Sequence, residues 1–103
     1  MIHDITIAHH EQTLHVSPGD KIRLQLEENP TTGYSWSMEE PGPFLSVIKN
    51  DYALLQGTGI GGGGRRTIEL NVEQSGSGSL QLKNWQRWSG DIYQAFQLNI
   101  QSA

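Results

Sequence analysis

Apolar side chains recur at every second position along most of this chain. The clearest case is residues 21–28, where Ile22, Leu24 and Leu26 alternate with charged and amide side chains. A period of two is typical of a β-strand with one buried face. No window of useful length has the 3.6-residue apolar period of a helix. The pattern therefore restricts the chain to an all-β fold.

Shorter runs of the same kind follow, with turn residues between them about every ten residues. We expect strands at 5–7, 14–16, 21–28, 34–38, 45–47, 52–55, 68–72, 80–82 and 96–100, and a turn at 75–78. The run at 52–55 is weak. Together they predict a single domain, residues 1–103, folded as an immunoglobulin-like β-sandwich of seven to eight antiparallel strands.

Composition excludes several classes of function. The chain of 103 residues has no cysteine, so disulfides, zinc–thiolate sites and a nucleophilic thiol are ruled out. Its net charge of -4 argues against nucleic acid as a partner, because phosphate binding needs a basic face. No apolar run approaches the roughly 18–20 residues that span a bilayer. Residues 1–4 lack the pattern of a signal peptide, and cytoplasm and bacterial periplasm both remain open.

Titratable residues do not converge in a pattern that indicates catalysis. The histidines His3, His9, His10 and His15 all lie in the first sixteen residues. Adjacent histidines on a strand point to opposite faces, so surface histidines are a better interpretation than a metal site. Without convergent acid and base groups we expect no enzyme activity, no catalytic residue, no metal and no cofactor.

Three connections between the expected strands have unusual composition. The first consists of Asn29, Pro30, Thr31, Thr32, Gly33 and Tyr34. Pro30 restricts the backbone, and Gly33 can adopt the positive φ that returns the chain to a strand. The stiff tip between them would present threonine side chains. An ordinary strand connection is the alternative interpretation.

The second connection, residues 57–64, ends in Gly61, Gly62, Gly63 and Gly64. So many glycines cost conformational entropy. They indicate either a flexible loop or a place where a partner's backbone approaches closely. A phosphate-binding loop is disfavoured, because no Gly-Lys-Ser/Thr sequence and no helix follow.

The third connection, residues 85–91, contains Trp85, Arg87 and Trp88. Leu80 and Leu82 indicate that even-numbered residues of this strand point toward the core, so Trp85 points away from it. Trp88 falls where the strand ends and a loop begins. An exposed tryptophan is a common anchor in protein interfaces, although it can also fold back as a lid over the sandwich. In an immunoglobulin-like order the three connections share one end, which suggests a binding edge.

These three segments resemble the motifs of the chagasin family, which inhibits papain-like cysteine peptidases. Residues 29–36, Asn-Pro-Thr-Thr-Gly-Tyr-Ser-Trp, are similar to its first motif, and 61–64 fit its Gly-X-Gly-Gly motif. Trp88-Ser89-Gly90 fits the end of its Arg-Pro-Trp motif, but Gln86 and Arg87 stand where the family has Arg and Pro. The similarity runs from about Leu14 to Ile100. Loss of the proline predicts a less preorganised third loop.

The resemblance implies inhibition by occlusion, without chemistry. Thr31 and Thr32 would cover the catalytic Cys–His pair of the peptidase. The glycine loop would lie along its substrate cleft through backbone hydrogen bonds, and Trp88 would pack on aromatic surface beyond it. Binding would be tight and reversible, with a cathepsin L-type or similar peptidase as the partner of a monomer.

A second hypothesis is a non-inhibitory sandwich that binds carbohydrate or protein. It would use Trp85, Trp88 and Tyr93 as an aromatic platform, which requires their rings to face one way.

Overall fold

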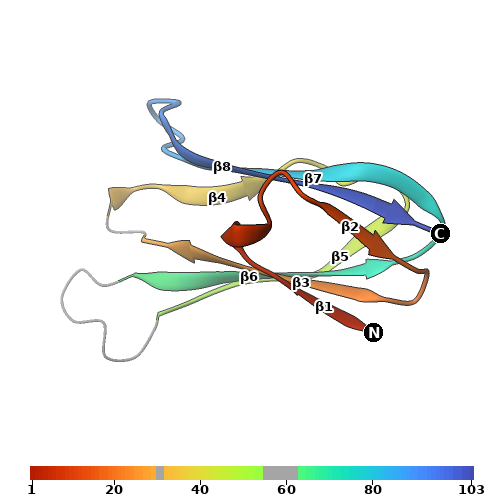
Figure 1. The fold of residues 1–103 in the computed structure, drawn as a ribbon. Helices are drawn as coiled ribbons and strands as arrows, with labels where there is room; N and C mark the ends of the chain where they lie inside the picture. Colours follow the sequence, from red (N-terminus) through yellow and green to blue (C-terminus); the bar gives the residue numbers. More distant parts are fainter. Residues whose placement is uncertain (30–31, 55–62) are drawn as a thin grey trace.

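The computed structural model describes residues 1–29, 32–54 and 63–103. Two four-stranded sheets pack face to face as a β-sandwich (Figure 1). One sheet has the order β1-β3-β6-β5 and the other β2-β8-β7-β4. The elements are β1 (Ile2–Ile5), the 3₁₀ turn η1 (Ile7–His9), β2 (Thr13–Val16), β3 (Lys21–Glu28), β4 (Ser35–Met38), β5 (Leu45–Leu54), β6 (Gly64–Val72), β7 (Gly76–Trp85) and β8 (Ile92–Ser102). The predicted all-β sandwich is thus confirmed.

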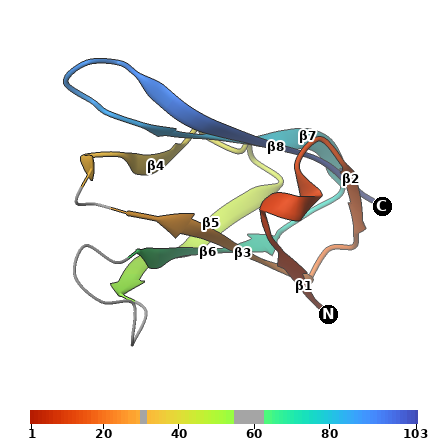
Figure 2. The ribbon, with the colours of Figure 1, turned by 60° about the vertical axis from the view of Figure 1, so that its left-hand side comes forward.

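The expectation of purely antiparallel strands is wrong at two places. β1 pairs with β3 in parallel, and β2 pairs with β8 in parallel, whereas the other four pairs are antiparallel. The cause is η1, which breaks the run expected at 5–7 and carries the chain from one sheet to the other (Figure 2). Thr6 caps this turn by accepting a hydrogen bond from the Ala8 N–H.

The core lies between the sheets and follows the alternation in the sequence. Ile22, Leu24 and Leu26 of β3 are buried, as are Leu80 and Leu82 of β7. The remaining core side chains come from the other six strands and from the segment before β5: Ile5, Val16, Trp36, Phe44, Leu45, Ile68, Leu70, Val72, Phe96, Leu98 and Ile100. Burial of this apolar surface is what holds the two sheets together.

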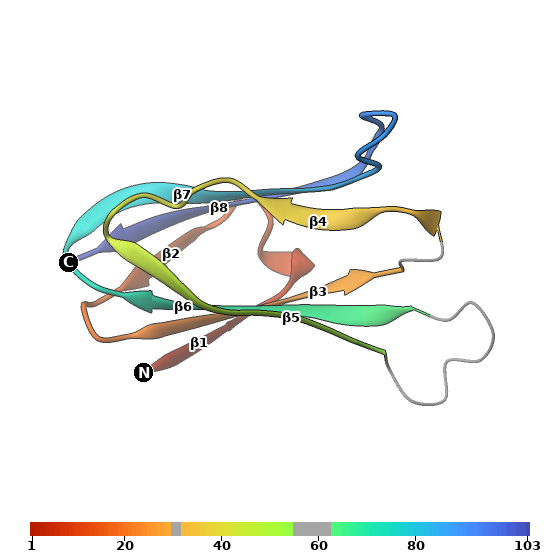
Figure 3. The ribbon, with the colours of Figure 1, turned by 180° about the vertical axis from the view of Figure 1, so that it is seen from behind.

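The four strands from β5 to β8 are longer than the sequence predicts, and in β5 and β7 the difference changes the interpretation of a segment. The separate runs expected at 45–47 and 52–55 form one strand, β5, with a bulge between Val47 and Lys49. Figure 3 shows it at the edge of its sheet, after the chain has crossed from β4. The turn expected at 75–78 is wrong, because β7 begins at Gly76. The ring of Phe44 lies against Gly76 and Gly78, so these glycines make room for a core side chain.

The turn before β3 is organised by one carboxylate. Asp20 accepts hydrogen bonds from the Ser17 N–H at 3.1 Å and the N-terminal amine at 3.3 Å, and it contacts His3 Nε2 at 2.8 Å. The bond to His3 contributes most to lowering the pKa of Asp20 to about 2.

Within the described ranges, no helix has the length and apolar character needed to cross a bilayer.

We predict that Asp20→Asn lowers the urea midpoint at pH 7 and that this difference disappears near pH 2. The folded pKa lies below the unfolded value of 3.8, so the carboxylate stabilises the fold above pH 3.8. That contribution is lost as pH falls from 3.8 towards 2. Urea unfolding from pH 7 to pH 2, with exposed Asp51→Asn as control, tests it. An Asp20→Asn effect independent of pH would contradict the assignment.

Candidate functional site

The three unusual connections meet at one end of the sandwich. In the first sheet, Glu28 at the end of β3 pairs with Gly64 at the start of β6, which also pairs with Leu54 at the end of β5. In the second sheet, Trp85 pairs with both Ser35 and Ile92. All these strand ends lie at the end of the molecule opposite the termini, which we call the loop end (Figure 1). Among the predicted site residues, Pro30, Thr31, Gly61 and Gly62 lie outside the described residues.

A buried carboxylate holds the bases of the first two connections. Glu28 is only 4% exposed. Its Oε1 accepts the Trp36 backbone N–H at 2.7 Å, so one hydrogen bond closes the base of loop 29–34. Arg66 of β6 binds the same carboxylate through two nitrogens, at 3.2 and 2.7 Å. A bidentate arginine–carboxylate pair fixes both distance and orientation.

Neighbouring side chains complete this base. Arg66 also donates to Asn50 Oδ1 at 3.1 Å, and its guanidinium lies 5.6 Å from the centre of the Tyr52 ring. The Tyr52 hydroxyl donates to the Glu28 carbonyl at 3.3 Å. Gly64, predicted as a loop residue, is the first residue of β6, and the Tyr52 ring and the Ala53 carbonyl leave no room for a side chain there. Packing within the protein therefore accounts for a glycine at position 64.

In the described part of the first loop, Thr32 is bound to Asn29. The Thr32 hydroxyl donates to the Asn29 carbonyl at 2.8 Å, and the Thr32 N–H reaches the same oxygen at 3.4 Å. Gly33 has φ +81°, a conformation that favours glycine. The six-membered ring of Trp88 packs on its Cα, where a Cβ would clash. Gly33 therefore joins the first loop to the third.

Gln86 closes the third loop without the proline of the resembled motif. Its N–H donates to the Asp91 carbonyl at 2.9 Å, and its carbonyl accepts the Gly90 N–H at 2.8 Å. The side chain accepts from the Ser89 hydroxyl at 2.9 Å and donates to the Thr32 carbonyl at 3.1 Å. In the sequence, Gln86 is only a departure from the resembled motif. Its role appears once Thr32, 54 positions away, lies beside it.

The tryptophans and the arginine of this loop point in different directions. Trp88 is 75% exposed although its ring touches Gly33, so it does not act as a lid that closes the sandwich. Arg87 is exposed and turns back to donate to the Ser37 hydroxyl at 3.3 Å. Trp85 donates to that hydroxyl at 3.0 Å, and Lys83 Nζ lies 3.7 Å from its ring centre. Trp85 therefore belongs to the outer face of the sheet, as predicted.

Tyr34 links the first loop to β8. Its hydroxyl donates to Asp91 Oδ2, and this bond raises the pKa of Tyr34 above its usual value of 10. Its ring centre lies 5.7 Å from that of Tyr93. Nothing in the local sequence pattern of Tyr93 indicates this contact.

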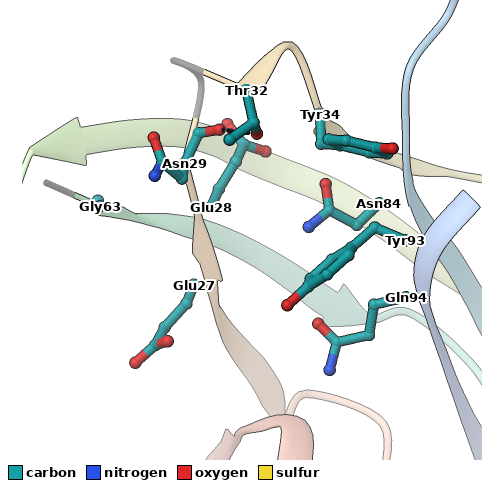
Figure 4. Close-up of a pocket in the computed structure, with 10 residues that line it drawn as sticks. Glu27, Glu28, Asn29, Thr32, Tyr34, Gly63, Asn84, Tyr93 and Gln94 are labelled. Carbon is teal, nitrogen blue, oxygen red and sulfur yellow. Dashed lines mark hydrogen bonds between the residues drawn. The ribbon is translucent and has the colours of Figure 1, made fainter. Parts of the chain in front are cut away.

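A cleft of about 630 Å³ opens between the sheets at this end (Figure 4). It is lined by Glu27, Glu28, Asn29, Thr32, Tyr34, Gly63, Gly64, Asn84, Tyr93 and Gln94. Asn84 is buried, and its Oδ1 has no hydrogen-bond partner within the described residues. The Glu28 carboxylate is already bound to Arg66 and Trp36, so it is not available as a general base. The arrangement provides shape and hydrogen bonding and is suited to binding.

The histidines do not form a metal centre in the part of the chain that the structure describes. His3 contacts Asp20, His9 accepts the Thr6 N–H, and His10 accepts the Gln97 N–H. No group of three or more potential ligands is found among these described residues.

We predict that Glu28→Gln destabilises the protein and loosens the loop end more than the adjacent change Glu27→Gln. The amide keeps an acceptor for Trp36 but leaves the Arg66 guanidinium without its counter-charge. Removing one partner of a buried ion pair costs roughly 3–5 kcal/mol, and the partial exposure of Arg66 places the effect at or below that range. Thermal unfolding measures the stability, and amide exchange at residues 29 and 32–36 measures the loosening. Equal results for the two variants would contradict the role of Glu28.

We also predict that Gly33→Ala displaces Trp88. Gly19 is a matched control, because it has φ +94° and open space around its Cα. Each substitution should cost roughly 1–2 kcal/mol of backbone strain. Only Gly33→Ala should shift the Trp88 indole N–H resonance and its fluorescence. If Gly19→Ala and Gly33→Ala leave Trp88 equally unaffected, the packing of its ring on Gly33 is wrong.

Comparison with known proteins agrees with this geometry. Chagasin from Trypanosoma cruzi is 28% identical over 105 residues, which cover 97% of this chain and 96% of chagasin. The crystal structure of the cysteine protease inhibitor EhICP2 from Entamoeba histolytica superimposes with a TM-score of 0.86 and 25% identity, covering 99% of this chain and 95% of that one. PbICP-C, solved in complex with falcipain-2, shares the fold with a TM-score of 0.60 and 18% identity, over 100% of this chain and 88% of that one.

The model of the chagasin family of peptidase inhibitors, I42, matches residues 15–100. This match includes β3 to β7, most of β8 and all three connections at the loop end. The chain therefore belongs to the chagasin family of peptidase inhibitors and is not an enzyme.

Proposed function

We propose that this protein is a reversible, tight-binding inhibitor of papain-like cysteine peptidases. It occludes the active-site cleft with loops 29–34, 57–64 and 85–91. The main support is the contact between the first and third loops, where Trp88 packs on Gly33 and Gln86 donates to the Thr32 carbonyl. The relatives named as cysteine protease inhibitors and the related fold solved with falcipain-2 favour the same class of target.

Preorganisation is the physical basis of tight binding in this proposal. The hydrogen bonds of Glu28, Gln86 and Thr32 are made within the free protein. Loops that are already ordered lose less entropy when they bind. The exposed Trp88 indole offers a large apolar surface beside Gly33 of the first loop. Tryptophans that become buried on binding are frequent hot spots of interfaces.

Roles within the interface follow the resemblance. We assign Thr31 and Thr32 to the region above the catalytic Cys–His pair, Gly61 to Gly63 to backbone contacts along the substrate cleft, and Trp88 to the far side. Arg87 is the least supported contact, because its guanidinium is directed to Ser37. The aromatic-platform alternative is less favoured, since Lys83 covers one face of Trp85 and Trp88 packs on Gly33.

The test is inhibition of papain and cathepsin L, measured with a fluorogenic peptide and with trypsin as the control peptidase. We expect dose-dependent, reversible inhibition of the cysteine peptidases alone. Trp88→Ala should weaken inhibition by at least about tenfold, in line with hot-spot tryptophans. The exposed Ile2 lies away from the loop end, so Ile2→Ala is the matched control and should have no effect.

Thr32→Val removes only the hydroxyl that donates to Asn29 and should weaken inhibition by a smaller factor. No inhibition of either cysteine peptidase at micromolar concentration would contradict the proposal. Inhibition that is unchanged in both Trp88→Ala and Thr32→Val would show that another surface binds the enzyme.

A further inference from the structure

Tyr93 lies at a bulge in β8 next to the proposed binding loops. Asn84 of β7 pairs with Gln94, but the next residue, Trp85, pairs with Ile92. Tyr93 is therefore the extra residue, without a partner across the ladder. Bulges of this kind interrupt the hydrogen bonding of a sheet and redirect a side chain, and they are frequent beside functional sites.

The redirected side chain gains little burial within the protein. Tyr93 is 70% exposed and its neighbour Ile92 is 54% exposed. The Tyr93 hydroxyl forms no hydrogen bond to another described residue, and its ring contacts that of Tyr34 at a centre distance of 5.7 Å and an angle of 54°. A large aromatic side chain held in place but left open to solvent is a common feature of interfaces.

The surface around Tyr93 is continuous with the first loop. Tyr93 lines the cleft together with Thr32 and Tyr34, and Figure 4 shows its ring extending into the cleft from β8. Tyr34 follows Gly33, which carries the Trp88 ring. Two adjacent residues of the first loop thus each contact an exposed aromatic side chain: Gly33 contacts Trp88, and Tyr34 contacts Tyr93.

We propose that Tyr93 and Ile92 extend the peptidase-binding surface from the three loops onto the start of β8. This inference rests on the proposed function. The matching feature of the peptidase is a flat apolar surface at the rim of its cleft, with a hydrogen-bond acceptor in reach of the phenol hydroxyl. A tyrosine supplies both kinds of contact with few rotatable bonds.

The test compares the dissociation rates of papain complexes formed by wild type, Tyr93→Ala, Tyr93→Phe and Gln97→Ala. Gln97 is an exposed residue of the same strand farther from the loops and serves as control. Tyr93→Ala should accelerate dissociation by about tenfold, as expected for an interface aromatic. Tyr93→Phe separates ring from hydroxyl, and a smaller acceleration is expected. Gln97→Ala should match wild type.

Two measurements on the free protein separate direct contact from a supporting role. The unfolding temperature and the hydrogen-exchange rates of the amides at residues 32–36 should be unchanged in Tyr93→Ala, because the side chain is largely exposed. Faster exchange at these amides would mean that Tyr93 acts by supporting Tyr34, which overturns the proposed contact. If wild type inhibits papain and Tyr93→Ala dissociates at the same rate, the extension is wrong while the inhibitor function stands. If wild type inhibits neither papain nor cathepsin L, both proposals fail.

Discussion

The buried ion pair between Glu28 and Arg66 is the interaction on which the loop end depends. The apolar core ends at this pair. The strands must nevertheless stay paired at the point where three connections leave them. An isolated buried charge would be costly, but Glu28 is matched by a bidentate guanidinium and by the Trp36 N–H. Such a pair adds less to net stability than apolar packing of the same volume would. Its effect is geometric, because it fixes the base of loop 29–34 and joins it to the strand that follows the glycine-rich connection.

A second set of contacts links the loops to one another above this base. Gln86 binds the Thr32 carbonyl, Trp88 packs on Gly33, and Tyr34 binds Asp91. The described parts of loops 29–34 and 85–91 are therefore held together before any partner arrives. An inhibitor of an enzyme cleft benefits from this order, because it presents a surface of fixed shape without supplying reactive groups. The buried carboxylate of Glu28 already has its partners in Arg66 and Trp36.

Much of the fold, and the meeting of the three connections at one end of it, could be predicted from the sequence, because both follow from local patterns. Alternation at 21–28 identified β3, and motif residues identified the loops. The parallel pairs escaped prediction because the crossover at Ile7–His9 is short and has no distinctive period. Glycines at 76 and 78 looked like a turn, although they accommodate Phe44 from another segment. The Glu28–Arg66 pair spans 38 positions and Gln86–Thr32 spans 54, so neither is visible in a local window.

The central claim is that this loop end is the surface that covers the peptidase active site. Hydrogen exchange of the free chain and of its complex with papain tests it most directly, with a second complex made from papain whose catalytic cysteine is blocked by a bulky substrate analogue. The account predicts new protection in residues 29–36, 63–64 and 85–93 of the first complex, and loss of that protection when the cleft is blocked. Protection centred on β1, β2 or the edge of β5, or a footprint that survives the blocked cleft, would contradict it.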